Sequence, residues 1–265
     1  MHNPIITLTT DFGVESPYVA AMKGVLLTLC RAATIVDITH AIPPQDVRQG
    51  AIVCHDLFPW FPPDTIHVGV VDPGVGSDRP LIYAELGTFR CLAPDNGLLS
   101  LLATRFPITR IVRLTKAEHW QPVLSATFHG RDILAPVAAR LALGIDPAAL
   151  GEPQLELVSL AWQTPISEPG YLQGKVLAID TFGNLLTNIT AEHLQAIPDP
   201  NQVTLDCHGF RLIGLARTYS DRSLGELVAL LNSSGRLELA IVNGSAAQKT
   251  GALVGSEIEV HWPTV

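Results

Sequence analysis

An aspartate and an arginine frame a glycine-rich turn that follows a strongly apolar stretch of the chain. Residues 66–71 predict a buried strand, because β-branched residues dominate them. Asp72 follows at once, Gly74 and Gly76 come next, and Arg79 closes the stretch. Glycine lets the backbone approach a ligand closely, and ligands of open α/β sheets bind outside the carboxyl ends of the strands. The stretch therefore predicts a charged ligand site at one edge of a sheet.

Further polar clusters lie where other strands are expected to end. In the order of the chain they are 9–13 (TTDFG), 37–40 (DITH), 94–97 (PDNG), 128–132 (FHGRD), 180–184 (DTFGN) and 232–235 (NSSG). Carboxylates accept hydrogen bonds from ligand hydroxyls, arginine supplies a fixed positive charge, and histidine exchanges a proton near neutral pH. Each cluster alone is equally typical of a structural turn or a helix cap, so the functional interpretation depends on their combination.

Strand and helix patterns alternate over residues 1–155. Strands are predicted at 5–10, 34–38, 66–71, 81–85, 89–93 and 111–114, and helices at 18–31, 47–58, 98–105 and 133–143. This alternation indicates an N-terminal α/β domain with a central, mostly parallel sheet covered by helices.

The pattern changes in the second half of the chain. Residues 156–170 contain prolines and no helical period, which predicts a linker. Residues 171–265 then read as one strand after another, and only 224–231 have a helical pattern. We expect a C-terminal all-β domain that resembles a barrel.

Composition excludes several classes of protein. The 265 residues carry a net charge of −8, so no basic surface for nucleic acid is expected. No apolar run approaches the roughly 20 residues of a membrane-spanning helix, and the N-terminus does not read as a secretory leader. The four cysteines form no CxxC pair, which favours free thiols in a reducing cytoplasm.

Taken in order, the clusters TTDFG, VDPGVG with the following arginine, APDNG, FHGRD and DTFGN resemble the S-adenosyl-L-methionine hydroxide adenosyltransferases, relatives of fluorinating and chlorinating enzymes. The resemblance covers essentially the whole chain. It implies a homotrimer in which one subunit's N-terminal domain meets a neighbour's C-terminal domain at each active site. The implied reaction is attack of water or hydroxide on the ribose C5′ of S-adenosylmethionine, without a metal or cofactor.

The resemblance also assigns the reacting groups. Asp72, Arg79 and His129 match the residues that hold the attacking water. Asp72 is the expected proton acceptor, Arg79 a fixed charge that orients Asp72 and stabilises hydroxide, and His129 positions the water or relays its proton.

The resemblance assigns the substrate contacts to both domains. Asp11 matches the carboxylate that accepts both ribose hydroxyls, and the C-terminal domain supplies contacts to adenine and to the methionine part. The matching C-terminal residues are Asp180, Phe182, Asn184, Ser233, Ser234, Asn243 and Gly244.

The chain departs from the family pattern in the residues around two ligand groups. Where the family often has an aspartate for the methionine ammonium, this chain has Ser16, beside Glu15. Where fluorinating relatives have tyrosine and threonine around the halide, it has Asp72 and Val75. A carboxylate there is expected to repel halide and to favour water.

Two alternatives remain open at the level of sequence. The first is a metal-dependent hydrolase that uses Asp11, Asp72 and His129, although the sequence shows no metal-ligand spacing. The second is a non-catalytic module that binds adenosine or S-adenosylmethionine. A chelator decides the first, and turnover to adenosine excludes the second.

Overall fold

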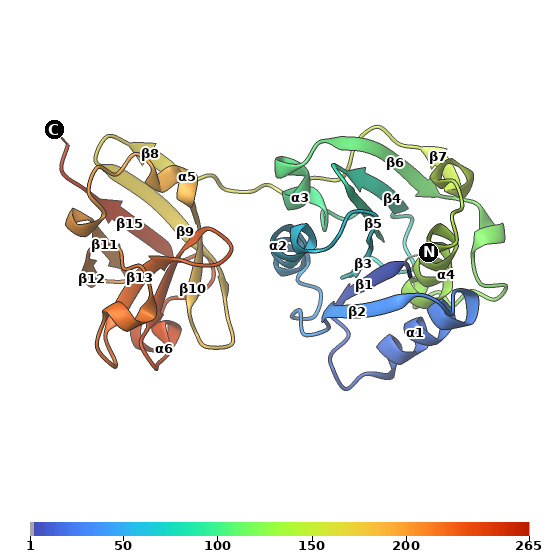
Figure 1. The fold of residues 1–265 in the computed structure, drawn as a ribbon, viewed down its shortest axis with the longest axis horizontal. Coiled ribbons are helices and arrows are strands. Elements are labelled where there is room, and N and C mark those ends of the chain that lie inside the picture. The colour runs from blue at the N-terminus through green and yellow to red at the C-terminus, as the bar shows by residue number, and fades with distance from the viewer. Residues whose placement is uncertain (1–2, 265) are drawn as a thin grey trace. The chain divides into compact units, whose positions relative to one another are not determined.

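The computed structural model describes residues 3–264, which divide into two compact units with the boundary after Ala161. Each unit is built on a sheet of its own (Figure 1). The first unit is α/β and the second is an almost closed antiparallel sheet, as the sequence predicts. Within residues 3–264, no helix is both long and apolar enough to cross a membrane.

The N-terminal unit contains a seven-stranded sheet in the order β2-β1-β3-β5-β4-β6-β7. Its strands are β1 (Ile5–Thr10), β2 (Thr34–Thr39), β3 (Ile66–Val70), β4 (Leu81–Leu86), β5 (Phe89–Pro94), β6 (Ile108–Leu114) and β7 (Gly151–Pro153). Strands β2, β1, β3 and β5 run parallel, and the remaining pairs are antiparallel. The sheet is therefore mixed, and its parallel half contains the strands that precede Asp11 and Asp72.

The strand order reverses between β1 and β3. The chain passes from β1 to β2 on one side and then to β3 on the other, and such a switch point opens a crevice at the carboxyl ends of the strands. Thr10 pairs with Val70 in the parallel register of β1 and β3. Asp11 and Asp72 therefore emerge beside each other at the same edge of the sheet.

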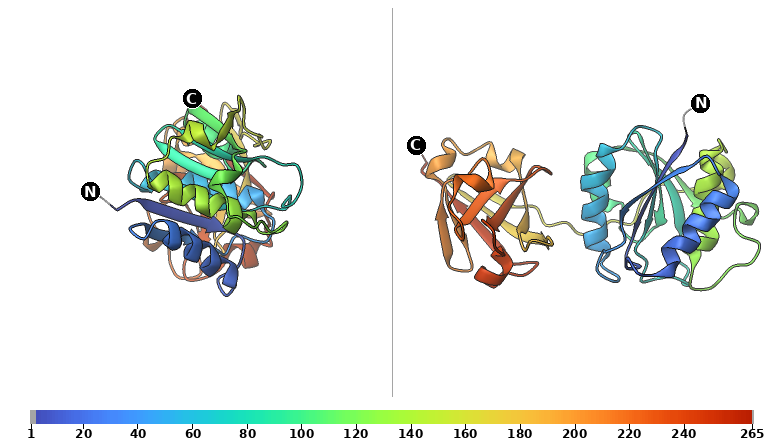
Figure 2. Two further views of the ribbon diagram at one scale, coloured as in Figure 1. Left: turned by 90° about the vertical axis from the view of Figure 1, so that its right-hand side faces the viewer. Right: turned by 60° about the horizontal axis from the view of Figure 1, so that its bottom comes forward.

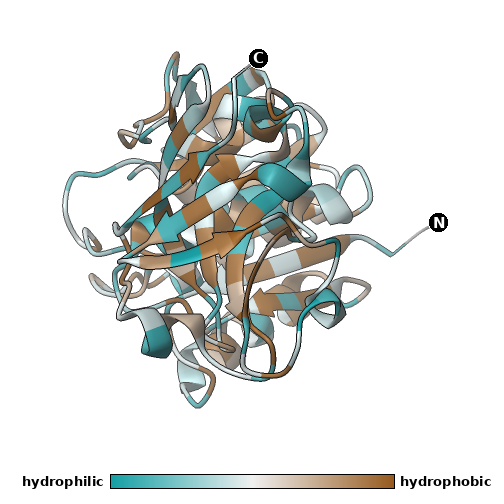
Figure 3. Cartoon of the chain, turned by 90° about the vertical axis from the view of Figure 1, so that its left-hand side faces the viewer, coloured by the Kyte–Doolittle hydropathy of each residue, from teal (hydrophilic) through white to brown (hydrophobic). Residues whose placement is uncertain are grey.

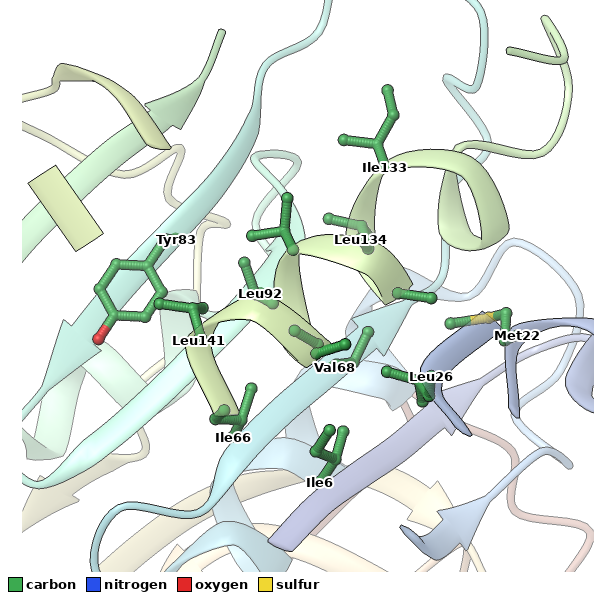
Figure 4. Close-up of a cluster of buried hydrophobic side chains, with 14 of the residues drawn as sticks. Ile6, Met22, Leu26, Ile66, Val68, Tyr83, Leu92, Ile133, Leu134 and Leu141 are labelled. Carbon is green, nitrogen blue, oxygen red and sulfur yellow. The ribbon is translucent and has the colours of Figure 1, made fainter. Parts of the chain in front are cut away.

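Helices cover both faces of this sheet (Figure 2). They are α1 (Pro17–Leu29), α2 (Val47–Leu57), α3 (Ser100–Arg105) and α4 (Ala135–Ala142). Helices α1 and α4 pack together on one face, and α2 and α3 pack together on the other. Met22 and Leu26, one turn apart on α1, face Ile6, Val68 and their neighbours in a fully buried cluster (Figure 4).

The C-terminal unit contains eight strands in the order β12-β11-β15-β9-β10-β14-β13, with β8 paired to β9. They are β8 (Ile166–Glu168), β9 (Tyr171–Ile179), β10 (Leu185–Thr190), β11 (Thr204–Cys207), β12 (Phe210–Ile213), β13 (Leu227–Leu231), β14 (Arg236–Ile241) and β15 (Glu257–His261), with short helices α5 (Ala191–Leu194) and α6 (Ala246–Thr250). Buried and less buried residues alternate along β9, and apolar and polar segments alternate along the strands in Figure 3. A bridge between Ala216 and Leu230 almost closes the sheet.

The predicted helix at residues 224–231 is wrong, because residues 227–231 form β13 and pair with β14. Val228, Ala229 and Leu230 are all buried, so the strand is covered on both faces. A short continuous apolar run of this kind cannot be distinguished from a buried helix by periodicity. Gly225 has a φ of 79°, which is incompatible with a right-handed helix at the start of the segment.

Two adjacent leucines of α1 test how this core stabilises the N-terminal unit. Leu26 is fully buried, whereas Leu27 is 44% exposed. We expect Leu26→Ala to lower the free energy of unfolding by about 2–5 kcal/mol through lost burial and a cavity. Leu27→Ala should change it by about 0.5 kcal/mol or less. Urea unfolding measures both, and equal effects would contradict the packing described for α1.

Candidate active site

A planar fork of hydrogen bonds joins Arg79 to Asp72 directly after β3. Arg79 Nε donates to Asp72 Oδ1 at 2.6 Å, and Arg79 Nη2 donates to Oδ2. The two side chains are only 10% and 8% exposed. Two parallel bonds between guanidinium and carboxylate fix orientation as well as distance. The predicted pairing of Asp72 with Arg79 is therefore present, and the carboxylate is held in one orientation.

The same guanidinium also reaches His129. Arg79 Nη2 lies 3.2 Å from His129 Nδ1. Arginine can only donate, so Nδ1 must carry a lone pair, and the proton of a neutral His129 is on Nε2. The three residues that the family resemblance assigns to the attacking water therefore form one connected group, in which His129 carries a further donor, Nε2–H.

His129 is held in its neutral form by its surroundings. Burial lowers the pKa of His129, and the charge of Arg79 lowers it further, against opposing effects of Asp72 and Asp132. A histidine whose pKa lies below its ordinary value is unprotonated at pH 7. It can then give a hydrogen bond from Nε2 without adding a second positive charge to the site.

A small cavity lies beside this group at the carboxyl ends of β1 and β3. Its volume is about 60 Å³. The lining residues are Asp11, Phe12, Val70, Asp72, Val75, Thr127, Phe128, His129 and Gly130. One water needs roughly 10–15 Å³ of such space, whereas small-molecule pockets measure about 300–1,000 Å³. The cavity therefore has room for water but not for a nucleoside.

Asp11 also lines the cavity and is fixed by a backbone donor. The N–H of Gln45 donates to Asp11 Oδ2 at 2.7 Å, which leaves Oδ1 available to a ligand. Gln45 has a φ of 66°, a left-handed conformation that is unfavourable for a residue with a side chain. Gln45 thus adopts a strained backbone conformation while its N–H orients Asp11, the carboxylate that the family resemblance assigns to the ribose.

Asn96 supports the strand end that carries Asp72. Its Nδ2 donates to the carbonyl of Val71 at 2.8 Å, and its Oδ1 accepts from Leu98 N at 3.2 Å. Asn96 thus holds the residue immediately before Asp72. The sequence marks the PDNG cluster but leaves open whether Asn96 contacts a ligand; the structure gives it this supporting contact.

In the C-terminal unit, Asp180 organises its own turn. Oδ1 accepts from the N–H groups of Phe182 and Asn184, both at 2.9 Å, and Oδ2 accepts from Asn184 Nδ2 at 2.9 Å. These bonds present Phe182, which is 75% exposed, at the mouth of a pocket. Asp180 shapes the turn that carries two pocket residues, and a direct contact to substrate stays a prediction.

The pocket beside this turn has the size of a ligand site. Its volume is about 490 Å³, within the range of small-molecule pockets. It is lined by Phe182, Asn184, Tyr219, Ile241, Val242, Asn243, Gly244 and Ser245. The pocket brings together four of the predicted contact residues from two separate segments of the chain.

Tyr219 is a pocket residue that the sequence did not indicate. Its hydroxyl donates to the buried carboxylate of Glu238 at 2.7 Å. Burial and that carboxylate raise the pKa of Tyr219 to about 12, so the phenol stays protonated. No spacing connects Tyr219 to the DTFGN cluster, and only the fold brings the two together.

Three serines at positions where the family contacts the methionine part lie outside the two cavities. Ser233 and Ser234 are exposed on the turn between β13 and β14 and do not line the pocket. Ser16 is the N-cap of α1, where its hydroxyl accepts from Tyr18 N at 3.3 Å. Ser16 therefore caps a helix, and the exposed carboxylate beside it belongs to Glu15.

Residues 3–264 contain no group of three or more His, Cys, Asp or Glu side chains arranged to hold a metal ion. The hypothesis of a metal site at Asp11, Asp72 and His129 thus gains no support from the described residues. Both oxygens of Asp72 are instead engaged by Arg79.

A guanidinium that orients both a carboxylate and a neutral imidazole beside a water-sized cavity is more than a structural turn requires. The arrangement suits a two-domain α/β enzyme that directs water at a small molecule.

The chain belongs to the SAM hydroxide adenosyltransferase family. Residues 6–151 match the N-terminal domain of that family, and residues 174–259 match its C-terminal domain. The two matches leave the predicted linker region between them.

The chain matches several named proteins over nearly its whole length. The (R)-S-adenosyl-L-methionine hydrolase of Salinispora arenicola is 39% identical over 97% of each chain. The protein of that name from Thermus thermophilus is 36% identical and covers 95% of this chain and 97% of its own. A fluorinase from Actinopolyspora mzabensis is 26% identical over 97% of each chain.

A solved structure of an uncharacterised conserved protein from Thermotoga maritima has a similar fold. Its TM-score is 0.92 at 34% identity, with 96% of this chain and 99% of that chain covered.

Replacement of Arg79 tests the coupling between the three side chains. Because the charge of Arg79 lowers the pKa of His129, we expect Arg79→Gln to raise that pKa, and the unpaired Asp72 carboxylate to raise it further. NMR titration of the His129 ring measures the change. Arg110→Gln is the matched control, since Arg110 on β6 pairs with Glu85 and Asp146, and neither carboxylate acts on the pKa of His129. A His129 pKa that is unchanged or lower in Arg79→Gln would contradict the contact.

Proposed function

We propose that this protein hydrolyses S-adenosyl-L-methionine to adenosine and L-methionine by attack of water on the ribose C5′. Family membership supports the proposal, as do the names of relatives that are 34–39% identical over nearly the full chain. Those names specify the (R) form of the sulfonium, so we propose that form as the substrate. The observation that carries the proposal is the contact of Arg79 with both Asp72 and His129, two residues that line the cavity.

The proposed chemistry needs an oriented water more than an acid. The leaving group is a neutral thioether that departs from a sulfonium, so it requires no proton. A water in the cavity donates one hydrogen to Asp72 and accepts from His129 Nε2–H, while Arg79 stabilises the developing hydroxide. As the new C–O bond forms and the C–S bond breaks, Asp72 takes the proton that the water loses.

The proposed substrate contacts follow the resemblance. Asp11 accepts the ribose hydroxyls, and the pocket of the C-terminal unit holds adenine against Phe182. The turn that carries Ser233 and Ser234 receives the methionine carboxylate. The remaining C-terminal contacts in the proposal come from Asp180, Asn184, Asn243 and Gly244.

We further propose a homotrimer in which each active site combines the N-terminal unit of one subunit with the C-terminal unit of another. The residues assigned to water and to adenine lie in different units, and the water cavity alone is too small for a nucleoside.

We also propose metal-independent turnover in the cytoplasm. A neutral leaving group needs no Lewis acid, and the four buried cysteines are free thiols, as a reducing compartment favours. EDTA should leave turnover unchanged.

Incubation with each sulfonium form of S-adenosylmethionine, followed by chromatography, tests the proposal. Adenosine and methionine in equal amounts are expected, faster from the (R) form. Free adenine as the main product would contradict attack at C5′, and binding without turnover would favour the non-catalytic alternative.

Replacement of Asp72 tests the proton acceptor. Asp72→Asn keeps the shape of the side chain but removes its ability to accept a proton, so we expect turnover to fall by about 10²–10⁴-fold. Asp78→Asn is the control, because Asp78 is exposed on the same turn and should leave turnover unchanged. Near-normal turnover in a folded Asp72→Asn protein would remove Asp72 from the mechanism.

Mixed oligomers test the sharing of sites. Co-expression of Asp72→Asn chains with Asn184→Ala chains should restore part of the activity that each variant lacks, because some sites then combine two intact halves. Co-expression of Asp72→Asn with His129→Ala should restore none, since both changes affect the N-terminal unit. Equal behaviour of the two mixtures, or a fully active monomer, would contradict shared sites.

A further inference from the structure

A chain of polar side chains runs from the surface to the strand end that carries Asp11. Lys23 Nζ on α1 lies 2.5 Å from Asp37 Oδ2 on β2. Asp37 Oδ1 lies 3.1 Å from His40 Nε2, and His40 Nδ1 lies 2.9 Å from Thr10 Oγ1 at the end of β1. Thr10 and His40 are buried, with exposed fractions of 0% and 7%. None of these residues lines the water cavity, yet the chain ends one residue before Asp11.

The direction of each contact follows from the chemistry of its groups. Lysine only donates and a carboxylate only accepts, so Asp37 receives Lys23 on one oxygen and faces a protonated Nε2 of His40 on the other. The contact between His40 Nε2 and Asp37 Oδ1 does not have the geometry of a hydrogen bond, so its contribution is mainly electrostatic. With the proton on Nε2, His40 Nδ1 accepts from the hydroxyl of Thr10.

Thr10 in turn forms a hydrogen bond with the backbone of the residues that follow it. Its Oγ1 accepts from Phe12 N at 3.3 Å while its hydrogen points to His40. The carbonyl of His40 accepts from Gly13 N at 2.8 Å. Asp11 lies between these contacts and is itself bonded to Gln45 N at 2.7 Å. The segment 10–13 is thus fastened to the segment 40–45 on both sides of the Asp11 carboxylate.

We propose that His40 is a positioning residue for ribose recognition: through Thr10 it holds the 10–13 turn so that Asp11 Oδ1 faces the ligand. This inference depends on the proposed function, in which Asp11 accepts the ribose hydroxyls. A charged hydrogen bond discriminates between ligands only when its acceptor is held in place. Asp37 and Lys23 act behind His40 by fixing its tautomer and its ring orientation.

The same strand offers an internal control. Thr7 Oγ1 lies 2.9 Å from His67 Nδ1, and both residues are buried. This second threonine–histidine pair has the same chemistry, but His67 stacks on Phe58 at 4.0 Å, and neither Thr7 nor His67 lines the water cavity. Burial lowers the pKa of His67 to about 3, so it is a neutral core residue. Loss of the Thr7 hydroxyl should lower the stability of the protein and leave nucleoside binding unchanged.

The test compares two nucleosides that differ only in the ribose hydroxyls. Isothermal titration of the full-length protein gives the Kd of adenosine and of 2′,3′-dideoxyadenosine. Hydrogen bonds to a charged acceptor predict that the wild type binds adenosine about 10- to 100-fold more tightly. In Thr10→Val, which keeps the shape and removes the hydroxyl, the ratio of the two Kd values should fall towards one. Thr10→Ser, which keeps the hydroxyl, should retain the wild-type ratio.

Each outcome has one meaning. Thr7→Val should lower the melting temperature and leave the ratio unchanged, which separates positioning from stability. A wild-type ratio in Thr10→Val and in His40→Leu, within about twofold, would overturn the inference and leave the proposed function intact; Thr10→Val decides alone where His40→Leu does not fold. A wild type that binds neither nucleoside, or binds both equally, would overturn the role of Asp11 in the proposed function together with this inference.

Discussion

The site depends on one arginine that contacts two partners. Arg79 gives two hydrogen bonds to Asp72 and uses one of the same nitrogens to approach His129. That contact decides the tautomer of His129, and the charge of Arg79 helps burial to keep the imidazole neutral. The fold supplies the rest: the strand order reverses between β1 and β3, and Asn96 ties down the residue before Asp72. Without Arg79, the largely buried carboxylate of Asp72 would lose its counter-charge.

The same pairing changes how the proposed site would distinguish water from halide. The sequence suggests repulsion of halide by Asp72, but Arg79 neutralises that carboxylate, so simple repulsion is weaker than expected. Hydrogen bonding discriminates better. Water can donate to Asp72 and accept from His129 at once, whereas a halide only accepts and would leave the carboxylate facing an anion. Val75, which lines the cavity, offers no donor that would compensate. The proposed preference for water then follows from the directions of the donors and acceptors.

Much of the fold could be predicted because its signals are local. The strand ending at Asp72, the helices on both faces and the succession of C-terminal strands follow from apolar periodicity and turn residues. The helix predicted at residues 224–231 was wrong because a short apolar run buried on both faces has no period that distinguishes a strand from a helix. Contacts between distant segments of the chain could not be predicted from the sequence. The approach of Gln45 N to Asp11, and of Tyr219 to the DTFGN turn, arises only when sheets assemble. Asp180 is the opposite case. The sequence suggested it as a ligand contact, whereas its carboxylate oxygens accept hydrogen bonds from its own turn.

The path of the water oxygen tests the proposed chemistry most directly. Turnover of S-adenosylmethionine in ¹⁸O-labelled water should place one heavy oxygen in the 5′-hydroxyl of adenosine and none in methionine, as mass spectrometry of both products would show. That result requires water to attack C5′ while the thioether leaves, which is the event that Asp72, Arg79 and His129 are proposed to support. Label at the ribose C1′ with release of adenine, or adenosine without label, would contradict it.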